Sequence, residues 1–180
     1  MRLPVNKFFF KFAIDRLFSC ILLLIVGPLI IVIGLGMWME SLFFGEPMGN
    51  VFYREDRVSR GKTFRMYKFR VLKTSVVEKI SGENSVWFFQ FDKKNTTWIG
   101  KVLIKFYLDE MPQILNNFLG QMSFVGPRPR FPSIYLENLE EGYEALKYLK
   151  GGITGPAQLA KGIVEKALPL SEKYMEKCNS

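Results

Sequence analysis

The sequence contains no histidine and only two cysteines among its 180 residues. Without an imidazole, the chain cannot form a Ser-His-Asp triad, a Cys-His nucleophilic site, a histidine general base or a histidine-ligated zinc centre. Cys20 and Cys178 stand far apart, and neither belongs to a CxxC pair. These features argue against a disulfide scaffold and against structural zinc. The candidate reactive groups are therefore carboxylates, lysines and hydroxyls.

Acidic residues are fewer than basic ones, because Asp plus Glu number 17 and Lys plus Arg number 25, for a formal net charge of +8. This charge favours an anionic partner such as nucleic acid, acidic lipid or a phosphorylated substrate. Residues 67–70 alternate aromatic and basic side chains, a pattern that also occurs in proteins that bind single-stranded nucleic acid. No recognition helix, zinc finger or RNP-like motif accompanies it, so we expect no nucleic acid partner.

Charge is missing from Leu17 to Met39, a run of 23 residues between Arg16 and Glu40. A helix needs about 20 apolar residues to cross the hydrocarbon core of a bilayer, so this run is long enough. It exceeds the apolar region of about 7–15 residues in a signal peptide, and no small-x-small cleavage site follows it. We therefore expect the segment to stay in or on a membrane.

Gly27 and Pro28 interrupt this apolar run near its centre. Proline removes a helical hydrogen bond and clashes with the preceding turn, which predicts a kink or a break. One interpretation is a single kinked span, because transmembrane helices tolerate proline. The other is a re-entrant helix–break–helix that enters and leaves through one leaflet. Basic residues flank both ends of the run, and the positive-inside rule then favours the second interpretation.

The rest of the chain predicts a small, basic α+β domain that is mostly helical, and we divide the protein into a membrane segment, 1–45, and a cytosolic domain, 46–180. Alternation over Val51–Arg57 and Thr63–Phe69 predicts a β-hairpin with its turn at 59–62. The other expectations are a loop at 74–97, helices at 97–107, 109–119 (ending at Gly120) and 135–150, a turn-rich loop at 151–156, and a short basic tail.

Asp109 and Glu110 stand at the predicted start of a helix, with Pro112 in its first turn. The helix dipole and the free N–H groups there stabilise a carboxylate as its anion. Asp109 could simply cap the helix, with Glu110 as a solvated acid in the first turn. Alternatively, Asp109 is a carboxylate nucleophile whose neighbouring acid helps to hold a divalent cation.

Arg128 and Arg130 alternate with prolines in the segment Gly-Pro-Arg-Pro-Arg. Because proline restricts its own backbone and that of the residue before it, this loop should be extended and stiff. Its guanidinium groups would then be partly preorganised to bind phosphate. A solvent-facing polyproline stretch explains the same sequence.

The order of the motifs is more informative than any one of them. The membrane segment is followed by VFYREDRVSRGKTFRMYKFR, then LDEMPQILNNFLGQMSFVGPRPR, then GGITGPAQL. This order resembles the bacterial sugar transferase family, the small monotopic phosphoglycosyl transferases that act on polyprenyl phosphate. The resemblance extends from about Phe12 to Gln158, and the block from Leu108 to Pro129 is its most specific part.

The resemblance implies transfer of a sugar phosphate from a nucleotide sugar, usually a UDP-sugar, to undecaprenyl phosphate, with release of UMP. It implies a re-entrant membrane element broken at Gly27 and Pro28, and a catalytic domain on the cytoplasmic face of the bacterial inner membrane. Such a reaction starts the assembly of an O-antigen, capsule, exopolysaccharide or glycoprotein glycan. Membrane lipid is then an expected partner, and a homo-oligomer and downstream glycosyltransferases stay open as partners.

By the same resemblance, Asp109 is the nucleophile, Glu110 completes the acidic dyad, and both help to bind Mg²⁺. Lys68, Arg70 and Arg128 match basic positions of the family and would contact phosphates. The remaining expected phosphate or substrate contacts are Lys105, which stands beside the uncharged Ile104, and Arg130 and Gln158.

Two other functions compete with catalysis. A non-catalytic family member could bind lipid phosphate or a partner, and an unrelated protein could combine a spanning anchor with a basic adaptor domain. No motif identifies the sugar, because selectivity depends on a few contacts in the pocket.

Overall fold

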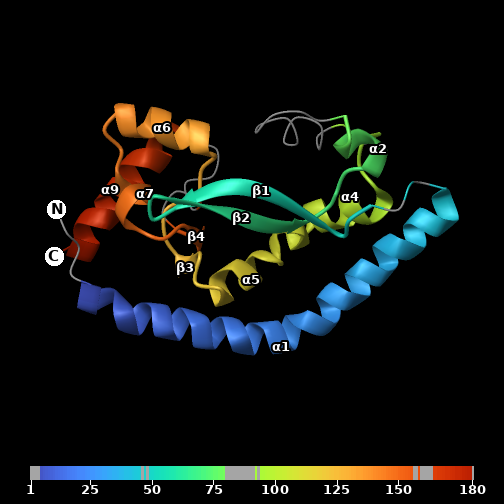
Figure 1. The fold of residues 1–180 in the computed structure, drawn as a ribbon, viewed down its shortest axis with the longest axis horizontal. Helices are drawn as coiled ribbons and strands as arrows, with labels where there is room; N and C mark the ends of the chain where they lie inside the picture. The colour runs from blue at the N-terminus through green and yellow to red at the C-terminus, as the bar shows by residue number, and fades with distance from the viewer. Residues whose placement is uncertain are drawn as a thin grey trace. The chain divides into compact units, whose positions relative to one another are not determined.

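The computed structural model describes residues 5–45, 47, 49–79, 92, 94–155, 158 and 164–179 (Figure 1). The chain forms two compact units that interleave along the sequence. Unit 1 contains Met1–Ile21, Asp56–Arg65 and Leu115–Ser180, and unit 2 contains Leu22–Glu55 and Met66–Ile114. The division at residue 45 expected from the sequence stays a prediction.

The fold is α+β and mostly helical, as expected. Unless noted otherwise, α denotes an α-helix, β a strand and η a 3₁₀ helix. In chain order the elements are α1 (Val5–Phe44), β1 (Phe52–Ser59), β2 (Lys62–Phe69), α2 (Thr74–Val77), α4 (Trp98–Lys105), η1 (Leu108–Glu110), α5 (Gln113–Phe118), β3 (Ser123–Val125), α6 (Pro132–Glu140), α7 (Ala145–Tyr148), β4 (Gly152–Thr154) and α9 (Val164–Asn179).

Helix α1 runs for 40 residues and is continuous through Gly27 and Pro28. The break predicted at these residues is therefore not seen, and the re-entrant arrangement stays a prediction. A proline inside a helix costs one backbone hydrogen bond without necessarily ending the helix. The part from Phe8 to Phe44 is long and apolar enough to cross a membrane.

Within unit 1, the first turns of α1 have the reverse polarity of a helix on a water-soluble protein. Asp15 and Ser19 are buried, and Lys11 is half-buried. Large apolar side chains point outward instead, among them Phe10 and Ile14. A helix that faces water shows the opposite pattern. The outer face of α1 is thus suited to lipid.

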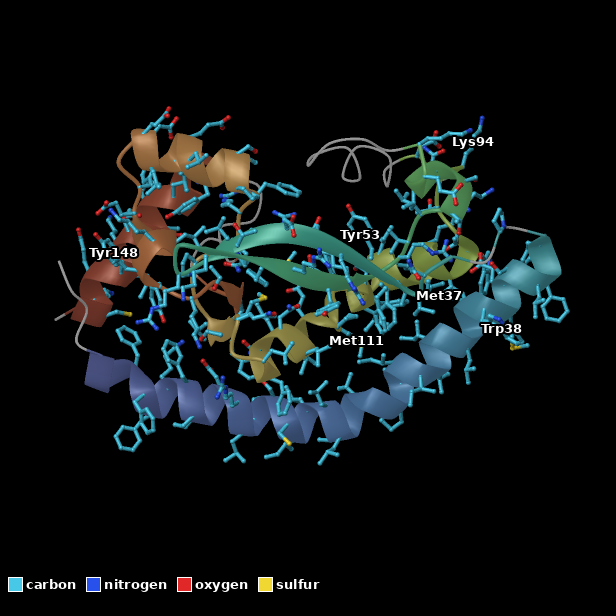
Figure 2. All side chains as sticks on the ribbon, in the orientation of Figure 1. Met37, Trp38, Tyr53, Lys94, Met111 and Tyr148 are labelled. Carbon is cyan, nitrogen blue, oxygen red and sulfur yellow. The ribbon has the colours of Figure 1, made fainter. Side chains whose placement is uncertain are left out.

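Within unit 2, α1 contributes to the main hydrophobic core. Met37 is buried with Phe69, Val71, Leu72 and Leu103. Partly buried residues surround this cluster, including Ile30 and Ile33 one and two turns earlier on α1. Figure 2 shows Met37 directed toward the domain and Trp38, the next residue, directed away from it. This core fixes α1, α4 and the end of β2 in one body.

The predicted β-hairpin is confirmed, with β1 and β2 as a two-stranded sheet. Arg60 and Gly61 form its turn, and both have positive φ, at 51° and 69°. A two-residue turn with both φ angles positive matches the twist of antiparallel strands. The hairpin belongs to both units and is the element from which Lys68 and Arg70 are placed.

A second, parallel sheet was not predicted. Strand β3 pairs with β4 in the register Ser123↔Gly152 and Val125↔Thr154. The strands approach so closely that a Cβ on Gly152 would lie 2.2 Å from the Gly126 nitrogen. The Gly-Pro-Arg-Pro-Arg motif and the later glycine-rich motif therefore meet in unit 1.

The predicted helices need several corrections. The helix at 97–107 is confirmed as α4, but the one at 109–119 divides into η1 and α5. It ends at Gly120 as expected, where φ is +76°. The helix at 135–150 is wrong: α6 and α7 are separate, with Gly142 between them at φ +87°. The tail forms α9. Helix α2 begins the predicted loop at 74–97, and residues 80–91 of that loop lie outside the described residues.

Candidate active site

The dyad of Asp109 and Glu110 lies in η1, one turn after α4. Tyr107 precedes it in a left-handed conformation, with φ 57°, and this residue turns the chain out of α4. Leu108 and Met111 pack against the core of unit 2, on either side of the dyad. One interpretation of the sequence made Asp109 the cap of a long helix, and the structure does not support it. Asp109 belongs to a short turn that apolar neighbours hold in place.

Helix α4 is itself fixed at its first turn by polar contacts. The Glu40 carboxylate of α1 accepts hydrogen bonds from the backbone N–H groups of Trp98 and Ile99, the second at 3.1 Å. The Thr97 hydroxyl oxygen accepts a further one from the Gly100 nitrogen at 2.9 Å. A carboxylate at a helix N-terminus also interacts favourably with the helix dipole. The dyad is thereby tied to the membrane helix through α4.

Lys68 connects the dyad to the hairpin. Its Nζ lies 3.0 Å from Glu55 Oε1 on β1 and 3.5 Å from Glu110 Oε1. The side chains of Lys68 and Glu55 are only 19% and 8% exposed, whereas that of Glu110 is 37% exposed. The more buried pair is screened least by water, so Glu55 fixes the position of Lys68. Glu110 is the more exposed and less firmly held of the two partners of Lys68.

Asp109 is half-buried, and its pKa is raised above the ordinary value of 3.8. Burial is the largest cause, and repulsion from Glu110 is the next; Lys68 and a backbone hydrogen bond oppose them, and Glu55 adds a smaller repulsion. A carboxylate whose anion is poorly solvated is a better nucleophile than a fully hydrated one. These surroundings are typical of a reactive group rather than a solvated surface acid.

Two basic residues predicted to contact phosphate have other surroundings in unit 2. Arg70 is 7% exposed, and it donates hydrogen bonds from Nε to the Asn50 carbonyl and from Nη1 to the Leu72 carbonyl, both at 2.8 Å. These hydrogen bonds connect the segment before β1, at Asn50, with the segment after β2, at Leu72. Lys105 is exposed on α4, with its ammonium 5.5 Å from the centroid of the Phe106 ring. The phosphate roles of both residues stay predictions.

The other predicted residues lie in unit 1. Arg128 and Arg130 line a cavity of about 340 Å³ formed by the proline-rich loop with α6, α7 and α9. Burial lowers the pKa of Arg130, and repulsion from Arg128 and Arg57 adds to this effect. Arg57 and Arg130 are half-buried and Arg128 is exposed, and three neighbouring guanidinium groups favour an anion as a partner.

Gln158 donates a hydrogen bond from Nε2 to the Gly152 carbonyl at 3.0 Å. Its Oε1 atom is buried and has no hydrogen-bond partner among the described residues. An orphaned acceptor of this kind leaves room for a donor from a ligand or a water molecule. Its expected contact with substrate stays a prediction.

Sequence reasoning missed Glu55. The signal is its position on β1, because Tyr53, Glu55 and Arg57 share the less exposed face while the residues between them are exposed. An acid at an inward position of a strand needs a buried cation, and Lys68 on the adjacent strand supplies one. Among the described residues, no group of three or more His, Cys, Asp or Glu could by itself hold a metal ion.

A comparison with protein families gives one match, to the family described as bacterial sugar transferase, over residues 6–180. The chain belongs to the bacterial sugar transferase family. The resemblance carried by the motifs from Leu108 to Pro129 is thereby confirmed.

Three relatives show the range of this transferase family. A UDP-glucose:undecaprenyl-phosphate glucose-1-phosphate transferase of Xanthomonas campestris pv. campestris is 35% identical, over 81% of this chain and 28% of its own length. An undecaprenyl-phosphate galactose phosphotransferase of Salmonella typhimurium is 32% identical, over 84% of this chain and 33% of its own length. The exopolysaccharide production protein ExoY of Sinorhizobium fredii is 30% identical, over 83% of this chain and 68% of its own length.

The chain spans about a third or less of the first two relatives, and about two thirds of the third. The names of the first two relatives differ in the sugar, glucose in one and galactose in the other. The sugar is thus a variable within the family, whereas undecaprenyl phosphate is common to both names.

Proposed function

We propose that this chain transfers a sugar 1-phosphate from a UDP-sugar to undecaprenyl phosphate and releases UMP. The observation that carries the proposal is the half-buried Asp109, whose pKa is raised, beside Glu110 and the Lys68–Glu55 pair. The activities named for the relatives support it, because two of them are sugar-phosphate transferases that use undecaprenyl phosphate.

In the first step, a carboxylate oxygen of Asp109 attacks the phosphorus that carries the sugar. A phosphorus–oxygen bond to Asp109 forms, and the bond from that phosphorus to the bridging oxygen of the diphosphate breaks. UMP leaves with the electron pair, and a sugar phosphate remains on Asp109. Burial favours this step, because the anion loses little solvation when its charge spreads onto the phosphoryl group.

In the second step, a phosphate oxygen of undecaprenyl phosphate attacks the same phosphorus. The new bond forms the lipid diphosphate sugar, and the bond to Asp109 breaks, which returns the carboxylate. Lys68 lies 3.5 Å from Glu110 and can turn toward a phosphate oxygen while Glu55 still holds it at 3.0 Å. Lys68 therefore stabilises negative charge in both steps.

The dyad fits a Mg²⁺ ion that takes most of its ligands from substrate and water. Mg²⁺ is commonly bound by one or two carboxylates together with phosphate oxygens, and Asp109 and Glu110 are two adjacent carboxylates. Glu55 is directed to Lys68 instead. When bound, the ion would neutralise charge on the diphosphate and on the leaving group.

Helix α4 supports a position of the dyad at the membrane surface. Trp98, Val102 and Phe106 are exposed at a spacing of four residues, with Trp98 67% exposed, and Lys101 and Lys105 are exposed beside them. An apolar stripe flanked by lysines is typical of a helix that lies in the interface of an anionic leaflet. A dyad one turn beyond this helix could meet both a soluble nucleotide sugar and a lipid phosphate.

We further propose that α1 becomes re-entrant in a bilayer, so that the domain faces the cytoplasm of a bacterial inner membrane. The support is that Pro28 weakens the middle of α1 and that basic residues flank both ends of the apolar run. Single cysteines in place of Lys7 and Asn50, in a chain with Cys20 and Cys178 replaced by serine, would test it. Labelling of both by an impermeant reagent from the same side is expected, and opposite sides would exclude it.

The activity is tested by sustained UMP release from the full chain in detergent, with undecaprenyl phosphate, Mg²⁺ and a panel of UDP-sugars. We expect release that needs the lipid and that Asp109→Asn abolishes. Asp56→Asn, the same chemical change at an exposed position of β1, is the control and should keep the activity. Release of UDP would overturn the mechanism. If folded protein releases no UMP with any UDP-sugar of the panel, the non-catalytic alternative is favoured.

A further inference from the structure

Three cations surround one aromatic ring in unit 1, outside the residues used above. The Phe12 ring of α1 lies with its centroid 3.8 Å from Lys150 Nζ, 5.7 Å from Lys11 Nζ and 5.9 Å from the Arg60 guanidinium carbon. The three come from different parts of the chain: α1, the turn between β1 and β2, and the residues after α7. The fold thus brings together three positive charges that lie far apart in the sequence.

These side chains line a cavity of about 320 Å³, which we call the Phe12 pocket. Lys11, Phe12, Arg60 and Lys150 are the residues that matter here, and the other described lining residues include no carboxylate. Among the described residues, Arg60 and Lys150 have the Phe12 ring as their charge-accepting contact. A ring face is a weak substitute for an anion.

In the part of the chain that the structure describes, Asp15 is the acid that acts on this cluster, and it is already engaged. Asp15 lies 3.5 Å from Lys11 and accepts a hydrogen bond from the Ser123 hydroxyl at 2.6 Å. Burial lowers the pKa of Lys150 to about 8, and repulsion from Arg16 and Arg60 adds to this, with Asp15 acting in the opposite direction and Lys11 as a smaller repulsion. Lys11 is thus already paired, and it also donates to the Ser123 hydroxyl and to the Val125 carbonyl, whereas Arg60 and Lys150 have no acidic partner among the described residues.

The helix that contributes Lys11 and Phe12 also carries exposed apolar side chains. Phe9, Phe10, Ile14 and Leu17 on α1 are all exposed, the second of them by 74%. A ligand that satisfied both features would carry an anionic head and an apolar chain. Such a molecule would place its head among the cations and its chain along α1.

We propose that the Phe12 pocket binds a phosphate group carried by a membrane lipid, through Lys11, Arg60 and Lys150. Arginine and lysine are the side chains that bind phosphate most effectively, and phosphate would supply the counterion that Arg60 and Lys150 lack among the described residues. This site goes beyond the transfer reaction, since none of Lys11, Arg60 and Lys150 is among the residues assigned to that reaction. Its role is to fix the first turns of α1 against the lipid headgroups.

The test is competitive labelling of lysines in the full chain, purified in detergent, with a trace of acetic anhydride at pH 8. Acetylation of Lys150 is measured by mass spectrometry relative to Lys62, an exposed lysine in the same unit. The probes are dihexanoyl phosphatidylglycerol, dihexanoylglycerol without phosphate, and inorganic phosphate. We expect protection of Lys150 by phosphatidylglycerol at a concentration at which the other two have no effect.

Variants separate a charge effect from a change of fold. Arg60→Gln should weaken the protection about tenfold, because one charged phosphate contact is lost. Arg60→Lys, which keeps the charge in the same turn, should keep the protection. Arg65→Gln, which removes an exposed charge outside the Phe12 pocket and leaves the Lys62 reference in place, should also keep it. Equal protection by inorganic phosphate would overturn the lipid assignment, and an unprotected Lys150 with every probe would overturn the site. Either result is distinguishable from loss of UMP release, which reports on Asp109.

Discussion

Replacing Lys68 by methionine removes the cation that Glu55 and Glu110 share. Glu55 then keeps a carboxylate that is 8% exposed without its partner at 3.0 Å. Breaking a fully buried ion pair costs about 3–5 kcal/mol. Since Lys68 is still 19% exposed, water screens part of this, and we expect a loss of about 2–3 kcal/mol. For a chain of this size that lowers the unfolding midpoint by about 5–10 °C.

The same substitution should change the pH dependence of activity. Lys68 lowers the pKa of Asp109, so its removal raises that pKa further. Because the nucleophile must be ionised, the pH at which UMP release appears should move upward in Lys68→Met. Residual activity should also be low, since a phosphate contact is lost.

The assay is a double-mutant cycle with Glu55→Gln, read by the unfolding midpoint of the full chain in one detergent. Lys68→Met together with Glu55→Gln should regain most of the lost stability, because the buried side chain that has lost Lys68 is then neutral. Activity should not return with it. The reasoning is refuted if Lys68→Met costs less than about 0.5 kcal/mol, as a screened surface pair would, or if the second substitution recovers nothing.

Three further predictions follow from buried polar groups. Asp109→Asn should abolish transfer and raise the unfolding midpoint at pH 7. The reason is that a pKa raised in the folded state means that ionised Asp109 destabilises the fold. This gain in the midpoint should vanish as the pH falls toward 3.8, the ordinary pKa of the group. For wild type, UMP release should increase with pH through the raised pKa of Asp109; a flat profile across that range would contradict its role. Asn116→Ala should lower the free energy of unfolding by about 2 kcal/mol, because the Asn116 amide donates to the Arg65 carbonyl and to Gln121. Asn117 is equally buried, but its side-chain amide has no hydrogen-bond partner among the described residues. Asn117→Ala should therefore cost clearly less. Equal losses in the two thermal midpoints would refute this difference.

The sequence was sufficient to predict the elements whose signals are local. The hairpin follows from alternation and from a turn that contains Gly61, and the helix predicted at 97–107 corresponds to α4, which Thr97 caps in the structure. The family could be predicted because the motif from Leu108 to Pro129 is contiguous, and the dyad predicted from the same motif stays a prediction. These features need no knowledge of contacts between distant residues.

What the sequence could not supply depends on such contacts. The pairing of β3 with β4 joins residues about 30 positions apart, through strands too short to show a pattern. The helix over 135–150 was predicted as continuous because Gly142 lies among polar residues that fit the amphipathic pattern. In the structure, Gly142 has a positive φ and separates α6 from α7. Glu55 shows only its position in the alternation of β1, and the Phe12 pocket has no local signal, because the partners of both come from other elements.

The central claim is that Asp109 carries the sugar phosphate, and intact-mass spectrometry of the chain tests it directly. The protein is incubated with Mg²⁺ and the UDP-sugar that it accepts, without undecaprenyl phosphate, and then quenched. We predict a mass increase equal to one sugar phosphate, located on the peptide that contains Asp109, with one UMP released per chain and no adduct in Asp109→Asn. Addition of the lipid should discharge it. Transfer to the lipid that proceeds in Asp109→Asn, or an adduct on another residue, would contradict the mechanism.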